Sequence, residues 1–245
     1  MISMSFFEYN DFWTKWWAFK EMGKTPSLLK KVVGLRFCKL LGSGGNDGFS
    51  IFPNWGLYAL LCVWETPLAA QNFFNNHPVF LDFKEKSKYY QNIFLESLSS
   101  HGKWDGQEPF ANPKKKTEDK IVVITRAKIK LSKIWHFWHF VRPASKDMQG
   151  KDGLIFSVGI GEIPLIQQAT FSIWENTEKM TQYAYKSKQH QQVIQKTRET
   201  GWYSEELFAR FAIISTEGNW DKFKALNKIL PLENNRLSDN FCGLY

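Results

Sequence analysis

Hydrophobic and polar residues follow two different spacings along this chain. Alternation with a period of two predicts half-buried β-strands, and apolar positions three or four apart predict helices. The strand pattern covers residues 2–7, 35–41, 56–64, 88–98, 120–129, 153–161, 165–174 and 206–216. The helical pattern covers about 11–33, a stretch from 66, 131–141 and 177–199, the last broken near Ser187.

The first two predicted helices begin with recognisable caps. Asp11 and Thr66 are suitable N-caps, and Pro67 stands at the first helical position, where its missing N–H is harmless. Within the first helix, Phe12, Trp16 and Phe19 fall on one stripe at helical spacing.

Three short motifs occur twice, in the same order. "GLRF" at Gly34 matches "GLIF" at Gly153, "CVWET" matches "SIWEN", and "HGKWDG" matches "EGNWDK", each pair roughly 110 to 119 residues apart. Each copy is expected to be a β-α-β-β-α-β unit of the ferredoxin-like type. The fold class is therefore α+β, a tandem ferredoxin-like repeat forming a pseudo-dimeric α/β barrel with an interior cavity. We expect units at 1–106 and 118–220, a linker at 107–117 and a tail at 221–245.

The strand alternation also suggests where two arginines point. Arg126 shares its phase with Val122 and Ile124, and Arg210 shares its phase with Phe208. We assign both arginines to the face turned away from the helices, together with Gln168, Thr170 and Ser172. An arginine enclosed between two sheets needs an anion or another partner, which a ligand carboxylate or an ordinary salt bridge can equally supply.

The composition of the chain limits the functions that we expect it to have. The 11 Trp and 21 Phe exceed what a core of this size needs and suit an apolar ligand pocket. The net charge of +8 is spread along the chain without any nucleic-acid module, so no nucleic acid is expected as a partner. Three cysteines at unpatterned spacings fit a reducing cytoplasm. No signal peptide or membrane-spanning run is apparent, although the Trp and Lys residues leave peripheral membrane contact open.

Several longer stretches together resemble one family. They are "GLRFCKLLGSGGNDGFSIFPN", "GKWDGQEPF", "TRAKIKLSKIWHFW", "VGIGEIPLIQQATFSIW" and "WYSEELFARF" followed by "EGNW". In this combination the chain resembles the spheroidene monooxygenase family, with "TRAKIK" where that family has "TRARIR". The resemblance implies haem b in the barrel, O2 as co-substrate, an electron donor such as ferredoxin, and an apolar substrate; members of the family act on acyclic carotenoids.

Haem iron needs an axial ligand, most often histidine. We expect His190 to be that metal ligand, because it lies in a resembling stretch before the last strand, and His77 is the second candidate. His101 is expected to be exposed, His136 and His139 lie on an outer helix, and Tyr185 or Lys188 are further donors. Arg126 and Arg210 are the candidates for binding haem propionates or for a catalytic place on the distal side.

Two other functions remain open at this point. One is a haem enzyme of different chemistry on the same barrel, dehydratase or peroxidase-like. The other is a carrier of haem or a lipophile without turnover. The oligomeric state is also open. Hydrolase and nucleotide-binding motifs are missing, since "GSGGNDG" lacks the Lys-Ser/Thr ending of a phosphate-binding loop.

Overall fold

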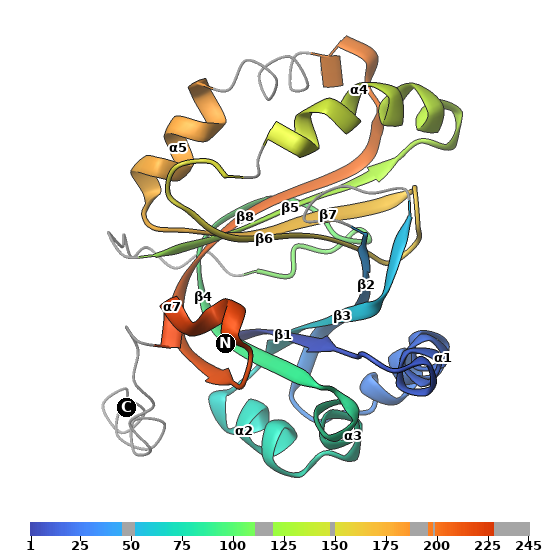
Figure 1. Ribbon diagram of the computed structural model, residues 1–245, viewed down its shortest axis with the longest axis vertical. Coiled ribbons are helices and arrows are strands. Elements are labelled where there is room, and N and C mark those ends of the chain that lie inside the picture. The colour runs from blue at the N-terminus through green and yellow to red at the C-terminus, as the bar shows by residue number, and fades with distance from the viewer. Residues whose placement is uncertain (46–51, 111–119, 148–149, 187–195, 198, 228–245) are drawn as a thin grey trace.

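The computed structural model describes residues 1–45, 52–110, 120–147, 150–186, 196–197 and 199–227. Its centre is a closed barrel with the strand order β1-β3-β2-β6-β7-β5-β8-β4 (Figure 1). The strands are β1 (Ile2–Glu8), β2 (Leu35–Gly44), β3 (Pro53–Trp64), β4 (Tyr89–Gly102), β5 (Ile121–Ile129), β6 (Leu154–Gly161), β7 (Gln167–Trp174) and β8 (Tyr203–Gly218).

The barrel consists of two equivalent halves. The first half has the order β4-β1-β3-β2 and the second β8-β5-β7-β6, which is the ferredoxin-like arrangement in both. The halves join at their edges, through a long pairing of β4 with β8 and a short one of β2 with β6 that includes Gly42 opposite Gly161. The predicted fold, a tandem ferredoxin-like α/β barrel, is confirmed.

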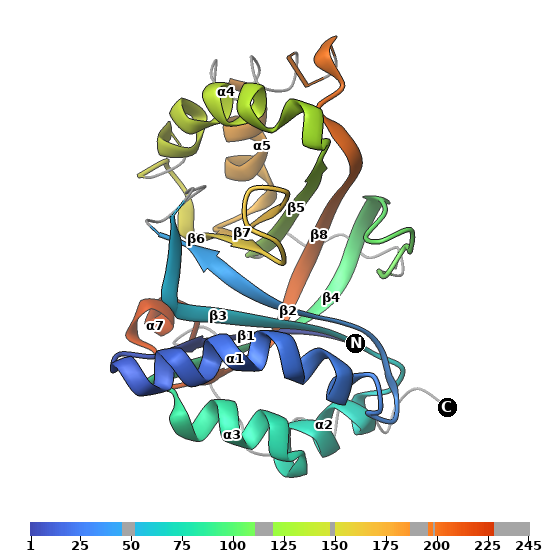
Figure 2. The ribbon, with the colours of Figure 1, turned by 90° about the vertical axis from the view of Figure 1, so that its right-hand side faces the viewer.

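Helices cover the outside of each half. The first half carries α1 (Phe12–Leu29), α2 (Pro67–Asn76) and α3 (Pro78–Lys86), and the second carries η1 (Leu131–Lys133), α4 (Ile134–Asp147) and α5 (Thr177–Lys186) (Figure 2). The short η2 (Asp221–Phe223) and α7 (Lys224–Asn227) follow β8. Asp11 and Thr66 cap α1 and α2 as predicted, whereas α1 ends at Leu29, earlier than expected. The predicted break near Ser187 lies outside the described residues.

The duplicated "GL.F" motif has a structural reason. Gly34 and Gly153 both adopt a left-handed backbone, with φ of 76° and 78°. A Cβ added to Gly34 would lie 2.5 Å from Cβ of Ala69, and one added to Gly153 would lie 2.5 Å from Cβ of Lys179. Each glycine thus lets the chain turn beneath a helix of its own half, which only glycine permits.

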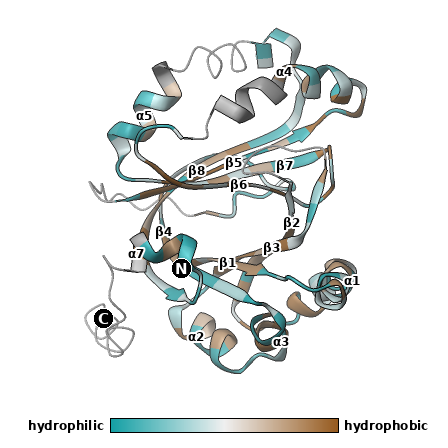
Figure 3. Cartoon of the chain, in the orientation of Figure 1, coloured by the Kyte–Doolittle hydropathy of each residue, from teal (hydrophilic) through white to brown (hydrophobic). Residues whose placement is uncertain are grey.

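Large apolar side chains occupy the inward positions of the strands. An eight-stranded barrel is just wide enough for side chains to fill or for one small ligand, so the predicted interior cavity stays a prediction. Two tryptophans from the repeated motif, Trp104 and Trp220, pack into this same core. Other members include Met4, Phe6, Leu41, Leu61, Ile93, Leu95, Val122, Ile124, Phe171, Ala209 and Phe211. Figure 3 shows hydrophobic segments along the strands of the barrel.

Within the described residues, no helix is both long enough and apolar enough to cross a membrane.

Candidate functional site

Arg126 points into the barrel, as predicted, and lies at one end of it. Its side chain is 1% exposed and forms ion pairs with Asp105 at 3.2 Å, with Glu162 at 3.9 Å and with Glu205 at close range. The guanidinium carbon lies 5.3 Å from the ring centroid of Trp104. Arg126 therefore joins the loop after β4 to strands of the second half.

Lys39 of β2 completes this ionic network. Its ammonium pairs with Asp105 and lies 2.6 Å from Glu162, which also accepts a hydrogen bond from Nε1 of Trp104 at 2.7 Å. Burial alone would lower the pKa of Lys39, but the bonds to the two carboxylates outweigh it and raise the pKa. Three carboxylates thus surround Arg126, although its buried Nε has no hydrogen-bond partner among the described residues.

Glu205 holds the loop after β4 from the opposite side. Its carboxylate accepts hydrogen bonds from the backbone N–H groups of Asp105, at 2.8 Å, and Gly106, at 2.6 Å. Burial favours a raised pKa for Glu205, but these N–H groups and the Arg126 guanidinium lower it below its usual value. Sequence reasoning missed this network; the signal for it was the repeated "WD" pair, which in the first half is Trp104 and Asp105.

Arg210 does not point into the barrel, so that prediction is wrong. In β8 the inward positions belong to Leu207, Ala209 and Phe211, all members of the barrel core. Arg210 lies opposite Val123, which packs on the helix side of the sheet with Phe208. In β7 the prediction is wrong in the same way, because the residues that fill the barrel are Ala169, Phe171 and Ile173. The helix side of the sheet therefore holds Gln168, Thr170 and Ser172, which were predicted to face the barrel. Both faces of these strands carry apolar residues, which made the phase ambiguous.

The helix-side face of the second half differs from that of the first. In the first half, large residues such as Tyr58 and Leu60 pack beneath the helices. In the second half, Thr125 lies on β5 between Thr170 of β7 and Phe208 of β8, yet its side chain is exposed. We call Thr125, Gly159, Thr170, Phe208 and Arg210 the second-half face; α4 and α5 lie over this side of the sheet (Figure 1).

The Arg210 side chain is incompletely satisfied on this face. Its Nε is buried and, among the described residues, has no hydrogen-bond partner. The guanidinium carbon lies 5.2 Å from the ring centroid of Phe208. A buried donor without a partner is costly, so an anion from outside the chain would find a ready site here.

Two of the described histidines already use a ring nitrogen as an acceptor. His77 caps α3, its Nδ1 accepting from the backbone N–H of Val79 at 3.3 Å, and its ring stacks on Phe73. Burial lowers the pKa of His77. In His136, Nδ1 accepts from Nε1 of Trp202 at 2.7 Å. A neutral ring that accepts at Nδ1 carries its proton on Nε2, so neither histidine can bind iron without losing this bond.

The remaining histidines add little to the site. His101 is exposed, as expected, and His139 is exposed on α4. His190, Lys188 and the side chain of Tyr185 lie outside the described residues. Among the residues that are described, no group of three or more His, Cys, Asp and Glu side chains is arranged to hold a metal ion.

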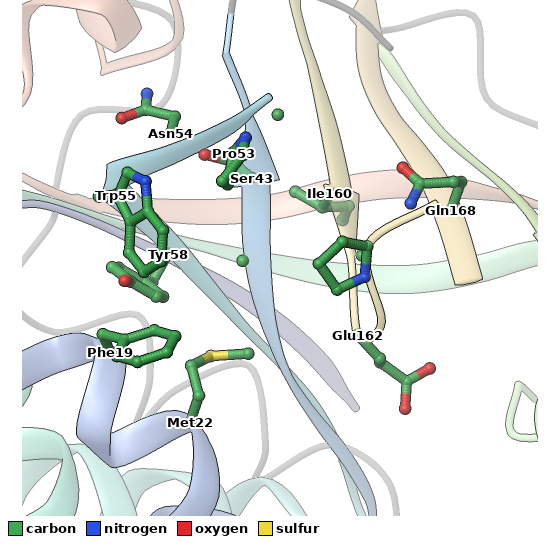
Figure 4. A pocket seen from close by; sticks show the side chains of 14 residues that line it. Phe19, Met22, Ser43, Pro53, Asn54, Trp55, Tyr58, Ile160, Glu162 and Gln168 are labelled. Carbon is green, nitrogen blue, oxygen red and sulfur yellow. The ribbon is translucent and has the colours of Figure 1, made fainter. Parts of the chain in front are cut away.

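A cavity of about 200 Å³ lies where the two halves meet at β2 and β6 (Figure 4). Phe19 and Met22 of α1 form one wall, with Trp55 and Tyr58 of β3, and Ile160 of β6 lies across from them. The lining is mainly apolar. Sites for drug-sized ligands enclose roughly 300 to 1,000 Å³, so this cavity suits part of an apolar chain rather than a macrocycle.

Comparisons with known proteins agree with this architecture. No protein-family model matches the sequence. A crystal structure of aldoxime dehydratase has a TM-score of 0.55 at 10% identity, covering 86% of this chain and 81% of that one, which shows a shared fold. Fold and duplication thus define a protein of the tandem ferredoxin-like α/β-barrel class.

Sequence relatives identify the family. Spheroidene monooxygenase of Rhodobacter capsulatus is 35% identical over 94% of this chain and 98% of its own length. Spheroidene monooxygenase of Cereibacter sphaeroides is 33% identical over 90% of this chain and 68% of its own length. The chain belongs to the spheroidene monooxygenase family and is an oxygenase.

Proposed function

We propose that the protein is a haem-dependent monooxygenase that inserts oxygen from O2 into an unactivated C–H bond of an acyclic, carotenoid-like substrate. The observation that carries this proposal is its similarity to spheroidene monooxygenase along nearly the whole chain. Electrons would come from a donor such as ferredoxin.

The residues of the second-half face fit a haem. A haem has two propionates, and Arg210 offers a guanidinium with a buried, partnerless Nε. Arginine is suited to this role because its planar donors match a carboxylate. The face is also lined by the short side chains of Thr125, which is exposed, and Thr170, and by Gly159, so a flat ligand would meet few bulky side chains there.

His190 is the proposed axial ligand. The family resemblance favours it, and His77 and His136 are held by hydrogen bonds through Nδ1. The segment that carries His190 joins α5 to β8, the strand of Arg210, so one stretch of chain would supply an iron ligand and a propionate partner. Bound haem would supply the binding and activation of O2.

The protein's own residues have separate tasks in this proposal. Arg210 neutralises the acidic edge of the cofactor, and Phe208 gives the same face an apolar wall. Helices α4 and α5 limit the access of water to that face, which strengthens the pairing of Arg210 with an anion. Arg126 keeps the opposite side of the sheet rigid through its carboxylate partners.

Turnover tests the proposal. The purified protein would be incubated with an acyclic carotenoid in detergent, a reductant, an electron-transfer protein and isotopically labelled O2. The expected result is a product that carries labelled oxygen, formed only when reductant and O2 are both present. Haem binding without turnover of any acyclic carotenoid would instead support a carrier, and turnover that needs no O2 would support a haem enzyme of other chemistry.

A further inference from the structure

Helix α1 exposes most of its aromatic residues, whereas Trp17 is partly buried, against Tyr9 and Phe83. Its buried residues are Ala18, Thr25 and Leu29. The stripe predicted from sequence, Phe12, Trp16 and Phe19, faces solvent, with exposures of 70%, 47% and 41%; the neighbouring Trp13 is 76% exposed. An ordinary surface helix turns its apolar stripe towards the core, so this reversal needs another explanation.

The exposed aromatic residues continue beyond the helix. The rings of Trp16 and Phe19 lie 5.7 Å apart, and those of Phe19 and Trp55 lie 4.8 Å apart. Phe52, which just precedes β3, is 74% exposed. We call Phe12, Trp13, Trp16, Phe19, Phe52 and Trp55 the aromatic ridge; α1 lies along the outer surface of the first half (Figure 2). A contiguous apolar surface of this kind marks an interaction site.

The charges next to the aromatic ridge are mainly positive. Lys20 and Lys24 are exposed on α1, and Lys30 and Lys31 are exposed directly after it. The acidic residue within α1, Glu21, is partly buried, accepts a hydrogen bond from Oγ1 of Thr25 at 2.5 Å and lies 3.7 Å from Lys24. Asp11 is used as the helix cap. The free charges of this surface therefore favour an anionic partner.

We propose that the aromatic ridge and its lysines dock the protein onto the surface of an anionic lipid bilayer. Tryptophan and phenylalanine insert at the boundary between headgroups and acyl chains, and lysine extends its ammonium to the headgroups. The cores of protein–protein interfaces are depleted in lysine, which makes a protein partner a poorer fit. In a dimer through α1, the lysines of both copies would come together and repel.

Docking would also place the 200 Å³ cavity at the lipid surface. Phe19 and Trp55 belong to the aromatic ridge and line that cavity. An apolar chain dissolved in the bilayer would then meet the cavity without crossing water. This last step rests on the proposed function, whereas docking itself stands on the geometry and charge of α1.

Vesicle flotation tests the docking proposal. The full chain would be mixed with phosphatidylcholine vesicles that contain or lack phosphatidylglycerol, and the floated fraction measured. The parent should bind the anionic vesicles, and added salt should weaken binding. Trp13→Ala with Trp16→Ala should reduce the partition coefficient on the order of ten-fold or more. Lys20→Glu with Lys31→Glu should reduce it roughly five-fold for each positive charge removed.

The matched control is Trp135→Ala, because Trp135 is 87% exposed on α4, in the other half of the barrel. It should float like the parent, and circular dichroism should show all variants folded. Failure of the parent to float with anionic vesicles, or equal losses from the α1 variants and Trp135→Ala, would overturn the proposal. A change of oligomeric state in the Trp13/Trp16 variant without any vesicle binding would assign α1 to a second copy. No substrate is needed, so this result is separate from the test of oxygenation.

Discussion

Arg126 of β5 and Arg210 of β8 project from opposite faces of the same sheet. Arg126 lies opposite Leu207, within the barrel, and Arg210 lies opposite Val123, on the helix side. Arg126 has three carboxylates around it, whereas Arg210 forms no ion pair with another described residue; the buried Nε of each arginine has no hydrogen-bond partner there. This contrast predicts opposite consequences for the same substitution at the two sites.

Arg126→Met should lower the free energy of unfolding by about 3 kcal/mol, because it leaves the partly buried Glu162 and Glu205 and the more exposed Asp105 with only Lys39 as a nearby cation. Urea unfolding followed by circular dichroism measures this. The control is Arg36→Met, which removes an exposed arginine bonded to the carbonyl of Pro109 and should cost less than about 1 kcal/mol. Equal losses in both variants would show that the network at Arg126 stabilises nothing.

Arg210→Met should leave the free energy of unfolding of the haem-free protein unchanged or raise it, since the change removes a buried unsatisfied donor. The same variant should bind haem roughly ten-fold or more weakly, because a hydrogen bond to a charged group contributes about 1.5 to 3 kcal/mol. Haem titration followed by absorbance measures the affinity, with Arg210→Lys as the charge-conserving control. Unchanged haem affinity in Arg210→Met would remove Arg210 from the cofactor site.

The lowered pKa of Glu205 makes its contribution depend on pH. A carboxyl whose pKa is lower in the folded state stabilises the fold above its unfolded pKa, about 4.3, and loses that effect as pH falls through the folded value. Glu205→Gln should therefore be less stable than the parent near pH 7, and the difference should shrink below about pH 4.3. Urea midpoints across this range, with exposed Glu178→Gln as the control, provide the measurement. A difference that stays constant with pH would contradict this account.

The repeat could be predicted because its motifs mark local geometry. Gly34 and Gly153 are needed for a left-handed turn under a helix, so each half keeps the signal at the same place. It was harder to predict which face of each strand points into the barrel, because β7 and β8 carry apolar residues on both faces. Alternation shows that two faces exist, but only packing decides that Phe171 and Phe211 face the barrel.

Gly34→Ala should lower the free energy of unfolding by about 1 to 3 kcal/mol, because alanine is strained at positive φ and its Cβ meets Ala69. Gly23→Ala is the matched control. Gly23 lies within α1, and a Cβ there has no neighbour within 4 Å. That change should raise stability by up to about 1 kcal/mol. Thermal unfolding of the two variants should therefore shift in opposite directions, and shifts of the same sign would contradict the assignment.

The candidate site was only partly predictable. Arg126 was placed correctly from strand phase, but Lys39, Glu162 and Glu205 are far apart in sequence and meet only when the barrel closes. Contacts between residues so far apart in the sequence leave no local sequence pattern from which they could be predicted. The alternation of one strand likewise does not reveal how large side chains from facing strands fill the space between them.

The absorption spectrum of protein expressed with a haem precursor, recorded beside His190→Ala and His77→Ala, tests the central claim most directly. The account predicts a Soret band and a histidine-ligated ferric spectrum in the parent and in His77→Ala. In His190→Ala it predicts loss of haem or of that ligation, with circular dichroism unchanged. A parent without a Soret band would contradict haem dependence, and an unchanged, fully loaded spectrum in His190→Ala would show that another residue binds the iron.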